Sequence, residues 1–381
     1  MKRILIPYFN AGFGHISFAR AIEAEVRRRQ PDWEVRLMDA GAEIPAKKLA
    51  HLYVGGWKWV LAQPGFIKSL LFAASARLTW AFGLFNRRAI KEALPGLRNY
   101  LDSFMPDVVV PTHWGCGHLF HAGRLEFGFT FPIAYLYTEL ASAYRQVVFP
   151  ADRYFCLTAE ARDALIGVGV VADTIRVVDL IVQPDLAAEL PERGESRRRL
   201  GLLEDLFTVL FSLGGEGIGN TVSYLDHYFE NGSQAQVLVL TGKNRTLLQV
   251  LTNRYQATEG KPRIIPVGYL PDLRTAFAAA DVFAGKCGTS FAVESIKARR
   301  PLLINQVGAP NEAENRDYMV KHGFGIHTPR PADLTAQIET FAVNPASYQR
   351  ALTPFAYVTG KSGAEDIVDY LVEELADRRK G

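Results

Sequence analysis

Hydrophobic residues in the first half of the chain fall in short runs, separated by longer stretches where apolar positions recur with helical spacing. Short runs predict buried strands, and the longer stretches predict amphipathic helices. The strands expected in this half are Ile4–Pro7, Glu34–Met38, Asp107–Pro111 and Ile133–Tyr137, and a helix is expected from about Ser17 to Arg29. Alternating strands and helices are typical of βαβ units, so the pattern predicts an α/β fold with a parallel sheet.

The same alternation begins again in the second half. The stretch Gln183–Gly201 is charged and contains proline, and we interpret it as an interdomain linker. The strands expected beyond it are Phe207–Leu213, Gln236–Thr241, Arg263–Val267, Asp281–Ala284 and Pro301–Ile304, and a final helix is expected over Gly363–Arg379. Since 381 residues exceed the size of one typical domain, we expect domains at 1–185 and 186–360 and a terminal helix within 361–381.

Composition and charge exclude a nucleic-acid-binding function. The chain is 48% hydrophobic and 22% charged, with a formal net charge of +3, which is ordinary for a globular protein. Its basic clusters, Arg27–Arg29, Arg197–Arg199 and Arg378–Lys380, fall at the ends of expected helices or in the linker. Dispersed charge of this kind predicts no nucleic-acid partner.

Cysteine content and hydrophobicity favour a cytoplasmic location. Cys116, Cys156 and Cys287 are far apart and have no metal-ligand spacing, which argues against a secreted disulfide framework. No apolar stretch of the signal-peptide type precedes the first strand. The most apolar segment, Phe66–Phe85, is interrupted by Lys68 and Arg77, so a membrane-spanning helix is not expected, whereas binding at a membrane surface stays open.

A glycine-rich turn, Gly12-Phe13-Gly14-His15, follows the first expected strand. Glycines let the backbone turn sharply and approach a ligand. The full dinucleotide-binding G-x-G-x-x-G motif is not present, because Ser17 stands at the position of the third glycine, and this weakens a nicotinamide-cofactor interpretation. His15 could accept a proton from an acceptor hydroxyl, and a purely structural histidine is an equally weighted alternative.

A second glycine-rich segment, Gly214-Gly215-Glu216-Gly217-Ile218-Gly219, follows the expected strand Phe207–Leu213. Such a density of glycine suits close approach to a phosphate or an acceptor, and an ordinary strand-to-helix turn is the alternative. No Gly-Lys-Ser/Thr follows, so the segment is not a P-loop.

The turn after the expected strand Asp281–Ala284 combines a cation with the start of a helix. We expect Thr289 and Ser290 to cap this helix, and its amide groups, together with Lys286 and Gly288, would suit a diphosphate. Glu294 lies one turn further and could accept the two hydroxyls of a ribose.

Downstream, Asn311 and Glu312 open another expected helix and could bind sugar hydroxyls, although an acidic first turn is favourable without any ligand. The chain contains no Asp-x-Asp element for a divalent ion, so we expect no metal and no cofactor. His113, His118 and His121 have no standard zinc spacing, and a zinc site is disfavoured.

Taken together, these segments resemble the monogalactosyldiacylglycerol synthase and processive diacylglycerol glucosyltransferase family, relatives of the peptidoglycan N-acetylglucosaminyltransferase. The most specific matches are 214–219, Thr241-Gly242-Lys243-Asn244, Val267-Gly268-Tyr269-Leu270, Lys286-Cys287-Gly288 with Glu294, and Asn311-Glu312 with Asn315. The resemblance implies the GT-B fold, in which two Rossmann-like domains face each other across a cleft. The first domain would bind the acceptor, the second would bind the nucleotide sugar, and the terminal helix would cross back to the first.

The resemblance implies inverting, metal-independent transfer of a hexose from a UDP-sugar to a lipid such as diacylglycerol. It places uracil against Tyr269 and Leu270, ribose on Glu294, and the sugar on Asn311 and Glu312. The other implied donor-binding residues are Gly214, Gly215, Glu216, Lys243, Asn244, Lys286, Gly288, Thr289 and Ser290.

On the acceptor side, Gly12, Phe13, Gly14 and His15 resemble the family's glycine-rich loop, and Thr138-Glu139-Leu140 resembles its Thr-Asp-Leu. His15 is then the first candidate for the base and Glu139 the second. The chain departs from the family in having Glu139 in place of aspartate and Asn311 in place of glutamine. Thr289 and Phe291 are also departures, in the diphosphate turn.

Aromatic residues Trp57, Trp59, Phe66 and Trp80 lie among cations between residues 49 and 91, a composition typical of a membrane-surface anchor and equally compatible with a domain core. His113 is assigned to the same acceptor or membrane side. Three other functions stay open, namely transfer to a soluble acceptor, epimerisation of a UDP-sugar, and binding of a nucleotide sugar without turnover.

Overall fold

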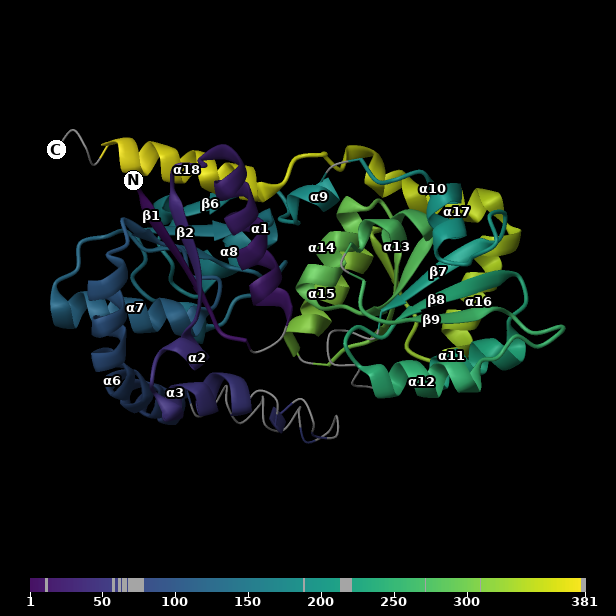
Figure 1. Cartoon of the computed structure of the whole chain (residues 1–381), viewed down its shortest axis with the longest axis horizontal. Coiled ribbons are helices and arrows are strands. Elements are labelled where there is room, and N and C mark those ends of the chain that lie inside the picture. The colour runs from purple at the N-terminus through teal and green to yellow at the C-terminus, as the bar shows by residue number, and fades with distance from the viewer. Residues whose placement is uncertain are drawn as a thin grey trace. The chain divides into compact units, whose positions relative to one another are not determined.

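A computed structural model describes residues 1–10, 13–56, 59–60, 63, 67, 79–187, 189–212, 221–270, 272–308 and 310–377 of the chain. The chain divides into two compact units (Figure 1). Unit 1 comprises Met1–Pro184, Ala309–Glu314 and Lys361–Gly381, and unit 2 comprises Asp185–Gly308 and Asn315–Gly360.

Unit 1 contains two parallel three-stranded sheets. In the first sheet, β1 (Arg3–Tyr8) lies between β2 (Glu34–Asp39) and β3 (Val108–Val109). The second sheet has the order β4 (Ala134–Leu136), β5 (Arg153–Cys156) and β6 (Ile175–Val177). A single parallel bridge between Val109 and Ile133 joins the two sheets. The strand order therefore reverses between β1 and β3, the type of position where open α/β sheets bind ligands.

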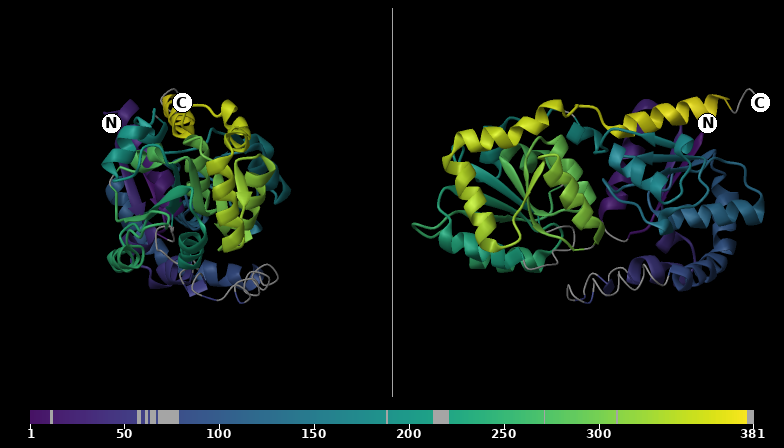
Figure 2. Two further views of the ribbon diagram at one scale, coloured as in Figure 1. Left: turned by 90° about the vertical axis from the view of Figure 1, so that its right-hand side faces the viewer. Right: turned by 180° about the vertical axis from the view of Figure 1, so that it is seen from behind.

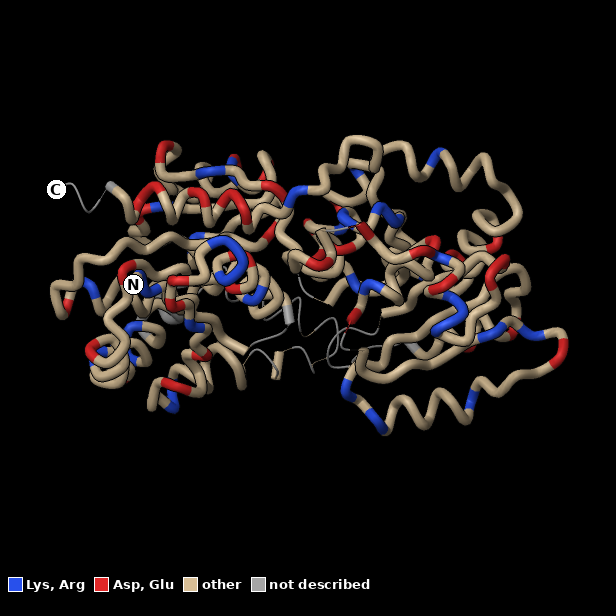
Figure 3. The backbone as a smooth tube through the Cα atoms, turned by 45° about the horizontal axis from the view of Figure 1, so that its top comes forward, with Lys and Arg blue, Asp and Glu red and all other residues tan. Residues whose placement is uncertain are grey.

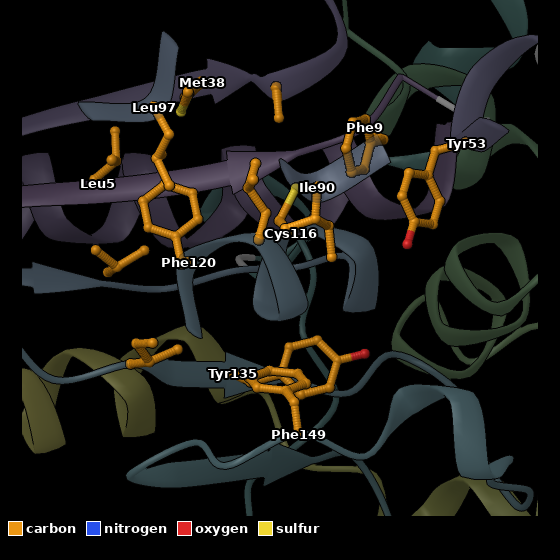
Figure 4. Packing of buried hydrophobic residues seen from close by; sticks show 14 of the residues in the cluster. Leu5, Phe9, Met38, Tyr53, Ile90, Leu97, Cys116, Phe120, Tyr135 and Phe149 are labelled. Atoms are coloured by element: carbon orange, nitrogen blue, oxygen red, sulfur yellow. The ribbon is translucent and has the colours of Figure 1, made fainter. Parts of the chain in front are cut away.

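Helices pack on the strands of unit 1 and enclose an aromatic-rich core. They are α1 (Phe13–Arg29), α2 (Ala40–Glu43), α3 (Lys47–Ala50), η1 (His51–Gly55), α6 (Thr79–Phe104), α7 (Trp114–Phe127), η2 (Arg145–Val147), α8 (Ala159–Gly167), η3 (Ala172–Thr174) and α18 (Gly363–Asp377). Figure 4 shows Phe9 beside Tyr53, whose rings stack at 4.7 Å, and Tyr135 beside Phe149. This core includes Phe9, directly after the carboxyl end of β1, so closely packed side chains support the candidate site of unit 1.

Unit 2 is built on one parallel six-stranded sheet of order β12-β11-β10-β7-β8-β9. The strands are β7 (Phe207–Ser212), β8 (Ala235–Leu240), β9 (Ile264–Val267), β10 (Val282–Lys286), β11 (Leu302–Gln306) and β12 (Gly325–His327). This is the strand order of a doubly wound nucleotide-binding domain, with its reversal between β7 and β10.

Helices cover both faces of the unit 2 sheet (Figure 2). They are α10 (Arg193–Arg199), α11 (Thr221–Asn231), α12 (Arg245–Arg254), α13 (Arg274–Ala279), α14 (Thr289–Lys297), α15 (Pro310–Lys321), α16 (Pro331–Val343), α17 (Pro345–Leu352) and η4 (Thr353–Tyr357). Leu225 and Leu334 pack with Leu303 in the core on one face. Phe277 and Phe291 contact Phe283, at centroid distances of 4.8 and 5.5 Å.

The terminal helix α18 packs against α1 within unit 1. Arg29 donates to Asp369 at 2.6 Å, and a Cβ added at Gly363 would lie 1.9 Å from the carbonyl oxygen of Asp179. Glycine is therefore needed where α18 begins, because the backbones approach too closely for a side chain.

The α/β fold predicted from the sequence is confirmed, and the expected strands lie within two residues of the observed bounds. Three short strands, β5, β6 and β12, were not expected. The first division between the units, at Pro184 and Asp185, falls within the stretch Gln183–Gly201 that was interpreted as a linker, and this stretch contains α9 (Pro184–Ala187) and α10. Arg197 of α10 is only 4% exposed and donates to the Asp281 carboxylate at 2.6 Å, which fixes α10 in unit 2.

Charged residues of both signs are interspersed over each unit (Figure 3). The arginines in the last turns of α1 and α10 pair with neighbouring carboxylates. Arg28 pairs with Glu25 at 2.6 Å, and Arg198 pairs with Glu204 at 2.7 Å. Among the helices that the structure describes, none is long and apolar enough to cross a membrane.

Candidate active site

His15 lies in the first turn of α1, directly after the carboxyl end of β1. Its Nδ1 is 2.6 Å from the carbonyl oxygen of Thr112, which follows β3, and the Thr112 hydroxyl donates to the carbonyl of His15 at 3.1 Å. A carbonyl only accepts, so Nδ1 carries the proton and Nε2 is left as the basic nitrogen. The sheet reversal of unit 1 thus holds an imidazole in one tautomer.

The imidazole of His15 is neutral at physiological pH. Burial lowers its pKa to about 4, and the hydrogen bond to Thr112 partly opposes this shift. A neutral imidazole is in the correct state to accept a proton, although a low pKa makes it a weak base until a charge or dipole stabilises its cation.

His113 is placed beside His15 and in the core, with only 5% of its surface exposed. The two rings meet edge to face at 4.6 Å, and His113 stacks on Trp114 at 5.5 Å. Its Nδ1 accepts from the backbone N–H of Gly115 at 3.0 Å and so caps α7, which leaves the proton on Nε2. Burial, with a smaller effect from His15, lowers the pKa of His113 well below its ordinary value.

Glu139, the second candidate base, lies in the loop after β4. Its Oε1 accepts from Nδ2 of Asn311 at 3.0 Å. In the same loop, the Tyr144 hydroxyl donates to Glu314 at 3.1 Å, and burial, with the charge of Glu314, raises the pKa of Tyr144. Glu139 is therefore engaged with a residue that the sequence assigned to sugar binding.

The sheet reversal of unit 2 lies beside the start of α14. A Cβ added at Gly285 would lie 2.8 Å from the carbonyl oxygen of Ser212, so β10 and β7 approach closely there. The expected capping by Thr289 and Ser290 is wrong, since the N-cap is Gly288 and no side chain caps the helix. Thr289 instead accepts from Nδ2 of Asn315 at 3.0 Å through its hydroxyl. The first-turn amides of such a helix favour an anion.

Glu294 lies in the second turn of α14 and is partly buried. Burial raises the pKa of its carboxyl group to about 8, so the group is protonated at neutral pH in the unliganded protein. A buried carboxyl with a perturbed pKa near the reversal point of a nucleotide-binding sheet is a candidate binding group.

The segments that follow β8 and β9 carry another group of the predicted donor-binding residues in unit 2. The ammonium of Lys243 lies 5.3 Å from the ring centre of Tyr269, and this ring is 61% exposed. Leu270 beside it is partly exposed. The side chain of Asn244 caps α12 by accepting from the N–H of Leu247 at 2.9 Å, a structural task that its sequence motif did not reveal.

The first turn of α15 carries Asn311 and Glu312, as the sequence predicted for a helix start. Glu312 is only 6% exposed, and Asn315 is completely buried. Burial of polar side chains here indicates a fixed arrangement rather than a solvated acidic turn.

Several predicted site residues fall outside the described residues: Gly12, Gly214, Gly215, Glu216, Trp57 and Phe66. The side chains of Phe13 and Trp80 also fall outside them, whereas Gly14 lies in the first turn of α1 and Trp59 is 57% exposed. Within the described part of the chain, no group of three histidine, cysteine, aspartate or glutamate side chains could hold a metal ion. His118, one of the histidines considered for zinc, is 2.8 Å through Nε2 from the carbonyl of Gln146.

Sequence reasoning missed two residues that shape the His15 environment. Thr112 fixes the tautomer of His15, and Tyr53 packs edge to face against His113 at 5.4 Å while donating to Asn86 at 2.6 Å. The only local signal for Thr112 is its place directly after a strand.

Known proteins with similar sequences are glycolipid synthases. The chain is 26% identical over 369 residues to a probable chloroplastic monogalactosyldiacylglycerol synthase of Glycine max, covering 91% of this chain and 66% of the relative. It is 20% identical over 382 residues to the processive diacylglycerol beta-glucosyltransferase of Bacillus pumilus, covering 98% and 95%. The chain thus spans slightly less than two thirds of the length of the Glycine max relative, and 64% of that of the Nicotiana tabacum protein. No protein-family model matches the chain.

Solved structures show the same fold. MurG of Acinetobacter baumannii superposes with a TM-score of 0.62 at 11% identity, covering 98% of this chain and 100% of that one. Anabaena HepE in complex with UDP-glucose gives a TM-score of 0.56 at 14% identity, covering 99% and 100%. The chain therefore has the GT-B fold and is a distant homologue of the monogalactosyldiacylglycerol synthases and of a processive diacylglycerol glucosyltransferase.

Proposed function

We propose that the protein transfers a hexose from a UDP-sugar to the hydroxyl of a lipid acceptor such as diacylglycerol. The observation that carries this proposal is the neutral His15, whose Nε2 is unprotonated because Nδ1 donates to Thr112. The distant homology to diacylglycerol glycosyltransferases supports the classes of donor and acceptor.

In the proposed reaction, unit 1 supplies the base and unit 2 holds the nucleotide. Nε2 of His15 takes the proton of the acceptor hydroxyl, and the oxygen attacks the anomeric carbon of the hexose. The bond from that carbon to the diphosphate oxygen breaks, and its electron pair leaves with UDP. Attack from the face opposite to the leaving group inverts the anomeric configuration.

Stabilisation of the leaving UDP is assigned to backbone dipoles and one cation. The first-turn amides of α14, with Gly288 as the N-cap, and the ammonium of Lys286 are the groups suited to the diphosphate. Glu294 is assigned to the ribose, and Tyr269 and Leu270 to the uracil. This assignment needs no divalent ion.

Two exposed aromatic side chains of unit 1 support the membrane side of the proposal. Trp59 and Phe85 expose 57% and 48% of their surfaces in the region assigned to the acceptor or membrane side. Exposed aromatic and apolar side chains near cations suit the surface of a bilayer, where a diacylglycerol acceptor is located.

The test is to incubate the protein with UDP-glucose or UDP-galactose and diacylglycerol vesicles, and to analyse the extracted lipids by mass spectrometry. The proposal predicts a hexosyl-diacylglycerol product, which is lost in His15→Ala. His227→Ala is the matched control, because His227 is also partly buried and loses one comparable bond, 3.0 Å to Thr335. Conversion of the UDP-sugar without lipid product would instead indicate an epimerase or a soluble acceptor.

A further inference from the structure

Two side chains separated by 172 residues meet in unit 1, where Nδ2 of Asn311 donates to Oε1 of Glu139 at 3.0 Å. A second bond joins the same two segments, from the hydroxyl of Tyr144 to Glu314 at 3.1 Å. The first turn of α15 is thus attached to the loop after β4 by two contacts of different chemistry.

The backbone on the Glu139 side of this contact is firmly held. The Tyr137 hydroxyl donates to the carbonyl of Ser142, and the Thr158 hydroxyl donates to the carbonyl of Leu140. Both neighbours of Glu139 in the sequence, Thr138 and Leu140, are buried. The position from which the Glu139 side chain extends is therefore fixed.

The backbone of Asn311 is also constrained, because Asn311 lies in the first turn of α15 next to the buried Glu312. With both backbones fixed, the lengths of the two side chains determine whether the amide reaches the carboxyl group. A change of one methylene on one side alone would break or strain the bond.

The bond also orients the Asn311 amide. Its nitrogen points to Glu139, so its carbonyl oxygen is turned to the other side and can accept from a hydroxyl group. An amide held in one orientation discriminates between a donor and an acceptor at a fixed position, and glucose and galactose differ in the direction of a single hydroxyl.

We propose that Glu139 is a positioning residue, which orients the Asn311 amide and thereby sets the preference for the hexose, and that Glu139 is not the base. The inference rests on the proposed function for the assignment of Asn311 to the sugar. The reach of the pair is the sum of the two side-chain lengths, so one methylene removed from Glu139 can be offset by one methylene added to Asn311.

A double-mutant cycle on Glu139→Asp and Asn311→Gln tests the pair. The readout is the difference in affinity between UDP-hexose and UDP, measured by calorimetry for UDP-glucose and UDP-galactose. Each single variant is expected to weaken hexose-dependent binding about tenfold, as for the loss of one hydrogen bond to a charged group. The double variant is expected to return to within about threefold of the wild type, and UDP alone should bind equally well to all four proteins.

Two further variants separate positioning from other roles. Glu139→Gln keeps an acceptor oxygen at the same reach, so hexose-dependent binding and most of the turnover should remain. Tyr144→Phe removes only the second contact and should leave the hexose preference unchanged.

Additive losses in the double variant would overturn the proposal, as would a loss of turnover in Glu139→Gln with unchanged hexose binding, which would make Glu139 a base. A Tyr144→Phe variant that reproduces the change in preference would also overturn it, because attachment of the loop would then be the cause. Because the readout is binding, the pair is tested even if the protein transfers no hexose. Equal affinities for UDP and UDP-hexose in the wild type would refute both the sugar assignment and the pair.

Discussion

Replacing Glu294 with glutamine should remove a pH dependence from the stability of the unliganded protein. Burial raises the pKa of Glu294 from its ordinary 4.5 to about 8. Between these two values the folded protein retains a proton that the unfolded chain has released. Stability is therefore highest below the lower value and falls as the pH rises toward 8.

The size of this effect follows from the shift. At ~1.4 kcal/mol per pKa unit, the full shift corresponds to about 5 kcal/mol. Glu294 is only partly buried, so solvent screening reduces the expected loss to about 2–3 kcal/mol. Glutamine resembles the protonated carboxyl group and does not ionise, so the variant should retain this free energy at pH 9.

The assay is denaturant unfolding of the wild type and Glu294→Gln from pH 4 to pH 9. We expect similar stability at pH 4 and a variant that is more stable by about 2–3 kcal/mol at pH 9. Glu259→Gln, at an exposed position of unit 2, is the matched control and should follow the wild type. Parallel curves for the wild type and Glu294→Gln across this range would refute the reasoning.

The same carboxyl group should link UDP binding to proton release. Two ribose hydroxyls donate to an ionised carboxylate, so binding favours loss of the proton that Glu294 holds at neutral pH. Calorimetry at pH 7 in buffers of different ionisation enthalpy should show a proton released on binding of UDP to the wild type, and none from this group in Glu294→Gln. Equal proton release by both proteins would remove Glu294 from the ribose site.

Two other predictions concern unit 1. Because burial lowers the pKa of His15 from 6.5 to about 4, the unfolded chain binds a proton that the folded protein does not. His15 is only partly buried, so solvent screening reduces the full shift, and stability should fall by about 1–2 kcal/mol as the pH drops from 6.5 to 4. His15→Gln should reduce this fall in acid unfolding curves, and an unchanged fall would show that other groups cause it. Gly363→Ala should destabilise the protein by about 1–3 kcal/mol in thermal unfolding, because its Cβ would meet the Asp179 carbonyl, whereas Gly360→Ala, which meets nothing within 4 Å, should not. Equal melting temperatures for the two glycine variants would contradict the close packing of α18.

Much of the fold could be predicted because its central strands are long apolar runs. The strands β7 and β8 are six residues each and nearly continuous in hydrophobic side chains. The missed strands are three or four residues long, and two of the three residues of β6 are exposed, so their hydrophobic runs are short or absent. The attachment of α10 to unit 2 could not be predicted, because the partner of Arg197 is Asp281, and no local pattern reveals a contact over 84 residues.

The candidate site was predictable only in part, because contacts between residues far apart in the sequence leave no local pattern. A glycine turn before a helix pointed to His15, but the carbonyl that fixes its tautomer lies 97 residues away. The capping expected of Thr289 follows a common local preference, which the contact with Asn315 overrides. The engagement of Glu139 with Asn311 could not be predicted from either motif alone.

The most direct test of the central claim is the release of UDP from UDP-glucose and UDP-galactose with and without diacylglycerol-containing vesicles. The account predicts release that requires diacylglycerol, is absent with vesicles that lack it, and is lost in His15→Ala while UDP binding is retained. Release that does not depend on diacylglycerol, or that persists in His15→Ala, would contradict it.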